Sequence, residues 1–161
     1  ERGIDLDIRF VGLAEPVTIR GKKDSGLSVR VAPSMSVDAG EGGQIMNSLG
    51  HRDKETWGKR APWVAFTGPV DGREMGIAMM HHPDSLRFPT PWHVRSYGLF
   101  TANPFALKEV AGEEGEDEIV LGAGEELPLG SFRLLFFEGG DAKAVVDEAW
   151  AEFSGGGPDS R

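Results

Sequence analysis

The chain has 161 residues and a formal net charge of −9 at pH 7, a length that suggests one domain. This acidic balance argues against a nucleic-acid partner, because nucleic-acid-binding domains normally present a basic face. The absence of cysteine excludes disulfides, thiolate metal sites and cysteine nucleophiles. No apolar run approaches the roughly 18 residues that a membrane-spanning helix needs. We therefore expect a soluble protein of the cytoplasm or the periplasm, without a membrane partner.

Short alternating segments dominate the first third of the chain. Residues 4–10 alternate between apolar and charged side chains, which predicts a half-buried strand. Residues 16–21 and 26–32 are predicted to form a strand pair, joined through Lys-Lys-Asp-Ser. A glycine-rich loop follows, and residues 44–48 are expected to form a short strand.

The same pattern continues through the middle of the chain. Residues 62–68 and 73–81 flank Pro-Val-Asp-Gly, whose composition favours a hairpin turn. Residues 92–102 predict a strand that bends at a glycine, and residues 117–122 and 131–139 predict a further strand pair.

One amphipathic helix is predicted near the C-terminus. In residues 141–153, Val145, Ala149 and Phe153 recur with a spacing of four, and Asp141 is placed to cap the helix. The glycine-rich residues 154–161 are expected to be a flexible tail. We therefore predict one domain over residues 1–153, mainly β: an antiparallel β-sandwich, or half of a larger one, with one C-terminal α-helix.

Residues 81–100 are rich in residue types that are unfavourable in a strand or costly to bury, including three of the four histidines and the only tyrosine. Prolines stiffen the first part of this segment, and a stiff loop is a good platform for a site. In the strand that follows, His93, Arg95 and Tyr97 share one face, and Trp92 lies on the other. Histidine can act as acid or base, arginine can hold a carboxylate, and tyrosine offers a hydroxyl. The segment is therefore either a binding site or a rigid structural corner.

The remaining histidines differ in what they suggest. His51 lies in a polar loop, and we expect a structural role for it and for His81. For His82 and His93 a structural and a functional role stay equally open. Their clustering with Arg87 and Arg95 favours a functional role, but the spacing does not prove it.

A second set of residues mixes indole and charge. Trp57 lies between Glu55 and Lys59, and exposed indoles beside charged groups suit sugar rings. The alternative is that Trp57 and Trp63 are core residues. Arg30 sits in an otherwise apolar strand, either on a concave wall or on the solvent face of an edge strand. No phosphate-binding glycine loop, G-x-S-x-G elbow or H-E-x-x-H motif is present, so nucleotide and serine-hydrolase chemistry have no support.

Residues 63–105, WVAFTGPVDGREMGIAMMHHPDSLRFPTPWHVRSYGLFTANPF, resemble the most characteristic block of a bacterial family labelled PmoA-like, or methane oxygenase PmoA. The segments GLSVRVAPSMS, GGQIMNSLG and LPLGSFRLLFFEGGDA resemble it as well, so the resemblance covers nearly the whole chain. Family members often have Asp where this chain has His81 and Gly where it has Ala106, which weakens a family role for His81. The label does not imply a membrane-embedded oxygenase subunit, because no membrane span is present.

The resemblance implies a β-sandwich of the carbohydrate-active type, similar in outline to aldose-epimerase-like proteins. On this basis the protein binds or modifies a sugar or uronate, with proton abstraction of the epimerase or lyase type if it is an enzyme. The catalytic residues would be His82, His93 and Arg95. The substrate-binding residues would be Arg87, Trp92, Tyr97 and Asn103, with Arg30, Asn47, Trp57 and Lys59 as a supporting wall.

Two other functions stay open. One is a non-catalytic structural or interaction module, which a buried His93 bonded to backbone would favour. The other is a metal protein with His82 and His93 as ligands; no cofactor is otherwise predicted, and a divalent metal is the one that these residues could hold. Family members are usually longer, so we expect either a homodimer or an N-terminal half that covers an exposed apolar face.

Overall fold

The structure is a computed structural model that describes residues 1–115 and 117–156. Its largest sheet is antiparallel and has the strand order β1-β10-β6-β5-β4. These strands are β1 (Arg2–Val11), β10 (Glu126–Glu138), β6 (Arg73–His81), β5 (Trp63–Val70) and β4 (Gln44–Asn47). The predicted hairpin over residues 62–81 is confirmed as the β5–β6 pair.

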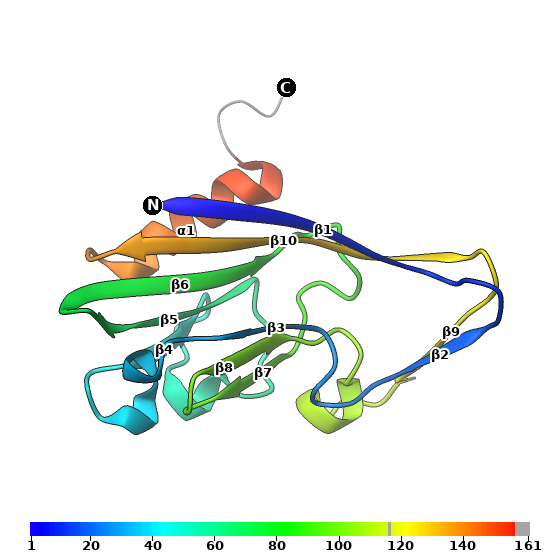
Figure 1. Cartoon of the computed structure of the whole chain (residues 1–161), viewed down its shortest axis with the longest axis horizontal. Helices are drawn as coiled ribbons and strands as arrows, with labels where there is room; N and C mark the ends of the chain where they lie inside the picture. The colour runs from blue at the N-terminus through cyan, green and yellow to red at the C-terminus, as the bar shows by residue number, and fades with distance from the viewer. Residues whose placement is uncertain (116, 157–161) are drawn as a thin grey trace.

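Two smaller antiparallel sheets lie against this large sheet (Figure 1). One has the order β3-β8-β7, and the other pairs β2 with β9. Their strands are β3 (Leu27–Arg30), β8 (Leu99–Ala102), β7 (Trp92–Arg95), β2 (Val17–Arg20) and β9 (Glu118–Leu121). The short helical turns are η1 (Pro33–Met35), η2 (Val37–Ala39), η3 (Asp53–Thr56), η4 (Leu107–Ala111) and η5 (Glu152–Gly156).

The main core lies between the large sheet and the smaller sheets. It combines inward side chains of both layers, such as Phe66 and Phe132 from the large sheet and Trp92 and Phe100 from the small one. A second apolar cluster lies on the outer face of the large sheet, where helix α1 (Ala142–Ala151) covers it. The predicted mainly β, sandwich-like fold with one C-terminal helix is therefore confirmed.

The predicted helix is confirmed in its cap as well as its position. The Asp141 carboxylate accepts hydrogen bonds from the backbone N–H groups of Lys143 and Ala144, at 3.0 and 3.3 Å. This is the N-cap geometry that the sequence predicts. Of the predicted tail, residues 154–156 belong to η5, and residues 157–161 lie outside the described residues.

Several predicted pairings are wrong. Residues 16–21 and 26–32 do not pair with each other, because β2 pairs with β9 and β3 pairs with β8. The strands at 117–122 and 131–139 are also separate, since β10 lies between β1 and β6. The predicted bent strand at 92–102 is a hairpin of β7 and β8, in which Gly98 has a φ of 98°. The first two errors assumed that neighbours in sequence pair in space, and the third missed a pair of neighbours that do.

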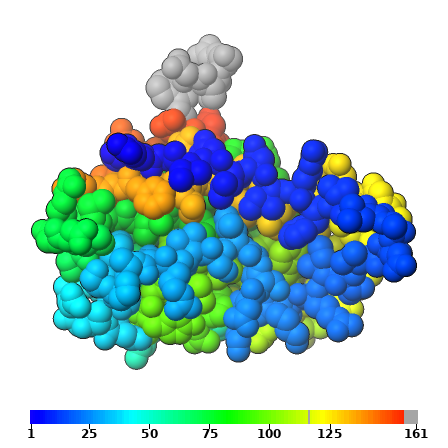
Figure 2. All heavy atoms as spheres, viewed as in Figure 1, coloured from blue at the N-terminus to red at the C-terminus, as the bar shows by residue number. Residues whose placement is uncertain are grey.

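Strand β1 forms one edge of the large sheet. Figure 2 shows the N-terminal residues, in dark blue, lying along the surface of the molecule. Ile4, Phe10 and Val11 on this strand are 50, 39 and 49 % exposed. That a second copy or an N-terminal half covers this face stays a prediction. No helix in residues 1–115 and 117–156 is long and apolar enough to cross a membrane.

Replacing Phe132 by alanine should strongly destabilise the fold. The side chain is fully buried in the main core, so we expect a loss of about 3–5 kcal/mol in the free energy of unfolding, measured by urea denaturation. Phe136→Ala, four residues along the same strand and 37 % exposed, is the control and should cost about 1 kcal/mol or less. Equal losses for the two variants would contradict the placement of the core.

Candidate functional site

The two faces of β7 divide as the sequence predicts. Trp92 and Val94 belong to the main core, whereas His93 and Arg95 lie on the opposite face of the strand. The register of the small sheet places Ser28, Thr101 and His93 side by side in one row across that outer face. Segments outside the sheet cover this row, since both Thr101 and His93 are 1 % exposed.

Both ring nitrogens of His93 are held by hydrogen bonds. Nδ1 lies 2.5 Å from the backbone carbonyl of Lys23, and because a carbonyl only accepts, Nδ1 carries the proton. Nε2 therefore accepts the hydrogen bond from Nε of Arg95, at 3.0 Å. The imidazole is a neutral ring with no free nitrogen in this arrangement. A general acid or base role for His93 would require one of these bonds to break.

Asn103 closes the same region from the other side. Its amide nitrogen donates to the carbonyls of Lys22 and Lys23, at 2.8 and 3.1 Å. Its amide oxygen accepts from the backbone N–H groups of Phe105 and Ala106, both at 3.1 Å. Because Asn103 is fully buried and its amide is satisfied internally, the predicted ligand-binding role for it does not fit the structure.

Trp57 is partly exposed and packs against both His93 and Arg95. Its ring meets His93 edge-on, with centroids 4.8 Å apart, and the Arg95 guanidinium lies 4.4 Å from the ring centroid. The Gly58 N–H donates to the Trp92 carbonyl and the Trp92 N–H donates to the Lys59 carbonyl, which joins this segment to β7. The indole is therefore fixed by neighbours on the sheet that it covers.

A shallow hollow opens at the surface beside this indole. We call it the Trp57 hollow, and its lining residues are His51, Lys54, Glu55, Trp57 and Lys59. Trp57 and Lys59 were expected in a binding wall, and the structure places them together. His51, for which we expected a structural role, lines the hollow and also contacts the Asn47 amide at 3.2 Å.

Three other predicted ligand-binding residues have internal roles instead. Trp92 is fully buried and its indole N–H donates to the Ala61 carbonyl, so it offers no stacking surface. Asn47 is buried and its amide oxygen accepts two backbone hydrogen bonds that close the turn after β4. The Arg87 guanidinium donates to the Pro104 carbonyl at 2.8 Å. Their polarity serves buried backbone groups, which need partners wherever water is excluded.

The remaining predicted residues lie apart from the cluster. His82 follows β6, accepts a hydrogen bond from the Asp84 N–H, and packs edge-on against Phe153. Among the described residues His82 and His93 contact no common partner, so the predicted acid–base pair is not assembled. Arg30 lies on β3, an edge strand, and is exposed with its guanidinium 5.1 Å from the Tyr97 ring centroid. This agrees with the alternative that Arg30 occupies a solvent face.

Within the described part of the chain, no three potential metal ligands come together.

Arg60 belongs to the charged and aromatic segment around Trp57, but the sequence did not indicate its partners. It forms a two-point ion pair with Glu113, with both contacts at 2.6 Å, and it donates to the Pro89 carbonyl at 2.6 Å. The hydrogen bond from Arg60 lowers the pKa of the Glu113 carboxyl below its usual range. Glu113 belongs to an acidic run that reads as a solvated loop, so no local signal pointed to this pair.

His81 is fully buried in the proline-rich region. It stacks on Phe132, with ring centroids 4.9 Å apart, and neither ring nitrogen has a hydrogen-bond partner among the described residues. Burial, with a smaller contribution from the neighbouring His82, lowers the pKa of His81 from 6.5 to about 4.

Comparison with known protein families gives a match over residues 1–151, nearly the whole chain. The chain belongs to the family of unknown function DUF6807. No curated protein and no solved structure matches it significantly. The DUF6807 family carries no functional description, so the resemblance to PmoA-like and carbohydrate-active proteins stays a prediction.

We expect Asn103→Ala to destabilise the domain by about 3 kcal/mol in urea denaturation, because buried backbone groups of two segments lose their partners. Gln44→Ala removes an exposed amide and serves as the control, with an expected change below about 0.5 kcal/mol. A small effect at Asn103 would mean that its hydrogen bonds do not hold the two segments together.

The stability of the protein should fall as the pH is lowered from 6.5 towards 4. In this range the unfolded chain binds a proton at residue 81 more strongly than the folded protein does, and the loss approaches about 3 kcal/mol. His81→Phe should flatten this part of the stability curve, whereas His51→Gln should leave it in place. The measurement is urea denaturation at a series of pH values, and an unchanged slope in His81→Phe would refute the assignment.

Proposed function

We propose that this domain binds a carbohydrate at the Trp57 hollow, in a non-catalytic role. The observation that carries the proposal is a partly exposed indole, fixed by Arg95 and His93, at the edge of an open hollow. Aromatic faces stack against the C–H surfaces of sugar rings, and a ring that is already fixed loses little entropy on binding.

The other lining residues support the same ligand class. Lys54, Lys59 and Glu55 bring both charge signs to the hollow, and His51 adds a ring nitrogen. Such groups donate to and accept from sugar hydroxyls. A nucleic acid fits this surface less well, since the chain is acidic and Glu55 lies among the lining residues.

The bonding of His93 favours binding over chemistry. The epimerase or lyase form of the function requires a free nitrogen on His93, and both nitrogens are engaged. The second candidate, a structural or interaction module without a ligand, is favoured by the same saturated hydrogen bonds around His93 and Asn103. The two candidates differ in whether the Trp57 hollow takes a ligand.

Sugar titrations followed by isothermal calorimetry test this function. Trp57→Ala should weaken the binding of neutral mono- or oligosaccharides by about tenfold or more, because the stacking surface is lost. Tyr97→Ala, which removes an aromatic ring that is 46 % exposed and lies outside the hollow, is the matched control and should bind as the wild type does. Absence of sugar binding, or equal binding by Trp57→Ala, would favour the ligand-free module.

A further inference from the structure

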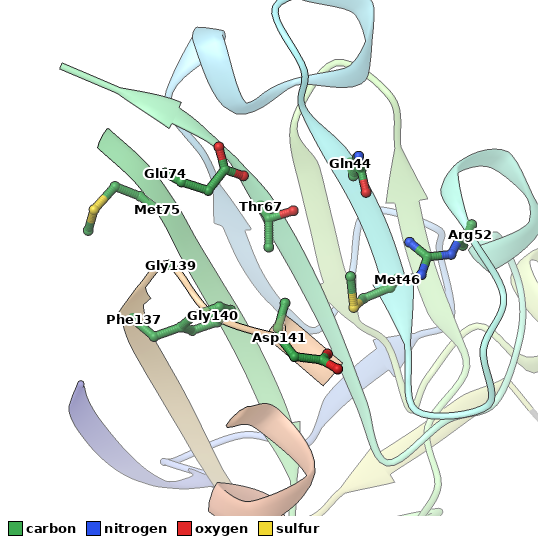
Figure 3. Close-up of a pocket in the computed structure, with 11 residues that line it drawn as sticks. Gln44, Met46, Arg52, Thr67, Glu74, Met75, Phe137, Gly139, Gly140 and Asp141 are labelled. Carbon is green, nitrogen blue, oxygen red and sulfur yellow. The ribbon is translucent and has the colours of Figure 1, made fainter. Parts of the chain in front are cut away.

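The outer face of the large sheet carries a second hollow. It has a volume of about 280 Å³ and lies beside the start of helix α1 (Figure 3). We call it the outer hollow. The lining residues that matter below are Gln44, Arg52, Thr67, Glu74, Phe137 and Asp141.

The hollow exists because of small residues on the outer face of the sheet. Gln44, Thr67, Gly76 and Phe137 form one row across β4, β5, β6 and β10. Gly76 has no side chain, and the Phe137 ring lies over it; a Cβ atom there would stand 2.1 Å from the ring. Thr67, between Gln44 and Gly76 in this row, also has a short side chain, and it lines the hollow together with Phe137 and the start of α1.

Arg52 is fixed at the far side of this hollow. Its backbone forms an antiparallel bridge with Met46, and the next residue, Asp53, accepts a hydrogen bond from the Ile45 N–H at 3.0 Å. Figure 3 shows the Arg52 side chain reaching over β4 towards Met46. The Arg52 backbone and the side chain of the next residue are thus both tied to β4.

The Arg52 guanidinium has no ion-pair or hydrogen-bond partner among the described residues. Arg60, Arg73 and Arg133, in contrast, each form a two-point ion pair with a carboxylate of the chain. An arginine fork at a hollow, unpaired with the carboxylates of the described residues, is suited to a carboxylate from a ligand.

Acceptors for hydroxyl groups lie on the other sides of the hollow. The Glu74 carboxylate points towards Thr67 in Figure 3, and it has no partner among the described residues. Asp141 caps α1 through Oδ1, which leaves Oδ2 unused. Met46 and Phe137, both less than 10 % exposed, supply the apolar part of the lining.

We propose that the outer hollow binds a small hydroxylated carboxylate of the size of one sugar acid. Arg52 holds the ligand carboxylate, and Glu74, Thr67 and Asp141 bind its hydroxyl groups. The volume is close to the lower end for small-molecule sites, which fits a single ring. A phosphate dianion fits less well, because Glu74 and Asp141 repel a second negative charge. This site does not depend on carbohydrate binding at the Trp57 hollow.

Calorimetric titration of the full chain with glucuronate, glucose and inorganic phosphate tests the proposal. We expect glucuronate to bind at least tenfold more tightly than glucose, and phosphate not to bind measurably. Arg52→Gln should reduce glucuronate affinity at least tenfold, to the level of glucose, and Arg52→Lys should lose part of it, because lysine keeps the charge without the fork. Arg30→Gln, an exposed arginine on the small sheet, is the matched control and should not change affinity.

Two further readouts make the result decisive. Trp57→Ala should leave glucuronate affinity at the outer hollow unchanged, which separates this site from the proposed sugar site. Thermal unfolding of Arg52→Gln should match the wild type, because the side chain is exposed. The titrations that decide the proposal are made in the Trp57→Ala variant, in which the proposed sugar site is removed. The proposal is overturned if glucuronate does not bind to this variant, if glucose binds to it as tightly as glucuronate does, or if adding Arg52→Gln leaves its glucuronate affinity unchanged.

Discussion

The backbone carbonyl of Lys23 holds the polar side of this fold together. It accepts hydrogen bonds from both His93 and Asn103, and so ties the turn before β3 to the outer face of β7. This contact fixes the His93 tautomer, which leaves Nε2 to accept from Arg95. Arg95 in turn lies over Trp57. The orientation of the one partly exposed indole in the cluster therefore depends on a carbonyl at the far end of the network.

The same network shows that most polar residues of this region have a structural role. Side chains that resemble a catalytic set in sequence are largely used to satisfy buried backbone groups, as Asn103 and Arg87 illustrate. What faces solvent is a different set, centred on Trp57 in one hollow and Arg52 in the other. Binding surfaces here are built on the frame that the histidine and asparagine hydrogen bonds stabilise.

Local patterns predicted the local structure well. The alternation in residues 4–10 gave β1, the Asp-Gly turn gave the β5–β6 hairpin, and Asp141 capped the helix as expected. The face of β7 that carries His93 also followed from simple alternation.

Non-local relations could not be predicted in the same way. Which strands pair with β2 and β3 depends on contacts between residues about seventy to a hundred positions apart, and no short pattern encodes them. The burial of Trp92 was missed because a tryptophan beside prolines suits either a core or a surface. Arg52 went unnoticed because its significance comes from Gly76 and Phe137, which share a row only once the sheet has formed.

The open edge of β1 has a consequence for how the protein behaves in concentrated solution. Natural edge strands are usually protected by charged side chains, above all lysine, by proline or by an outward bulge. Residues 2–11 contain neither lysine nor proline, and Asp5, Asp7 and Arg9 are engaged with side chains of the neighbouring strand β10. The register shift beside Ile8 falls on the β10 side, so β1 itself stays regular. Its unpaired backbone groups form a template to which another extended segment can add by hydrogen bonding. Strand addition at this edge, and not loss of the core, is the route by which we expect the folded protein to self-associate.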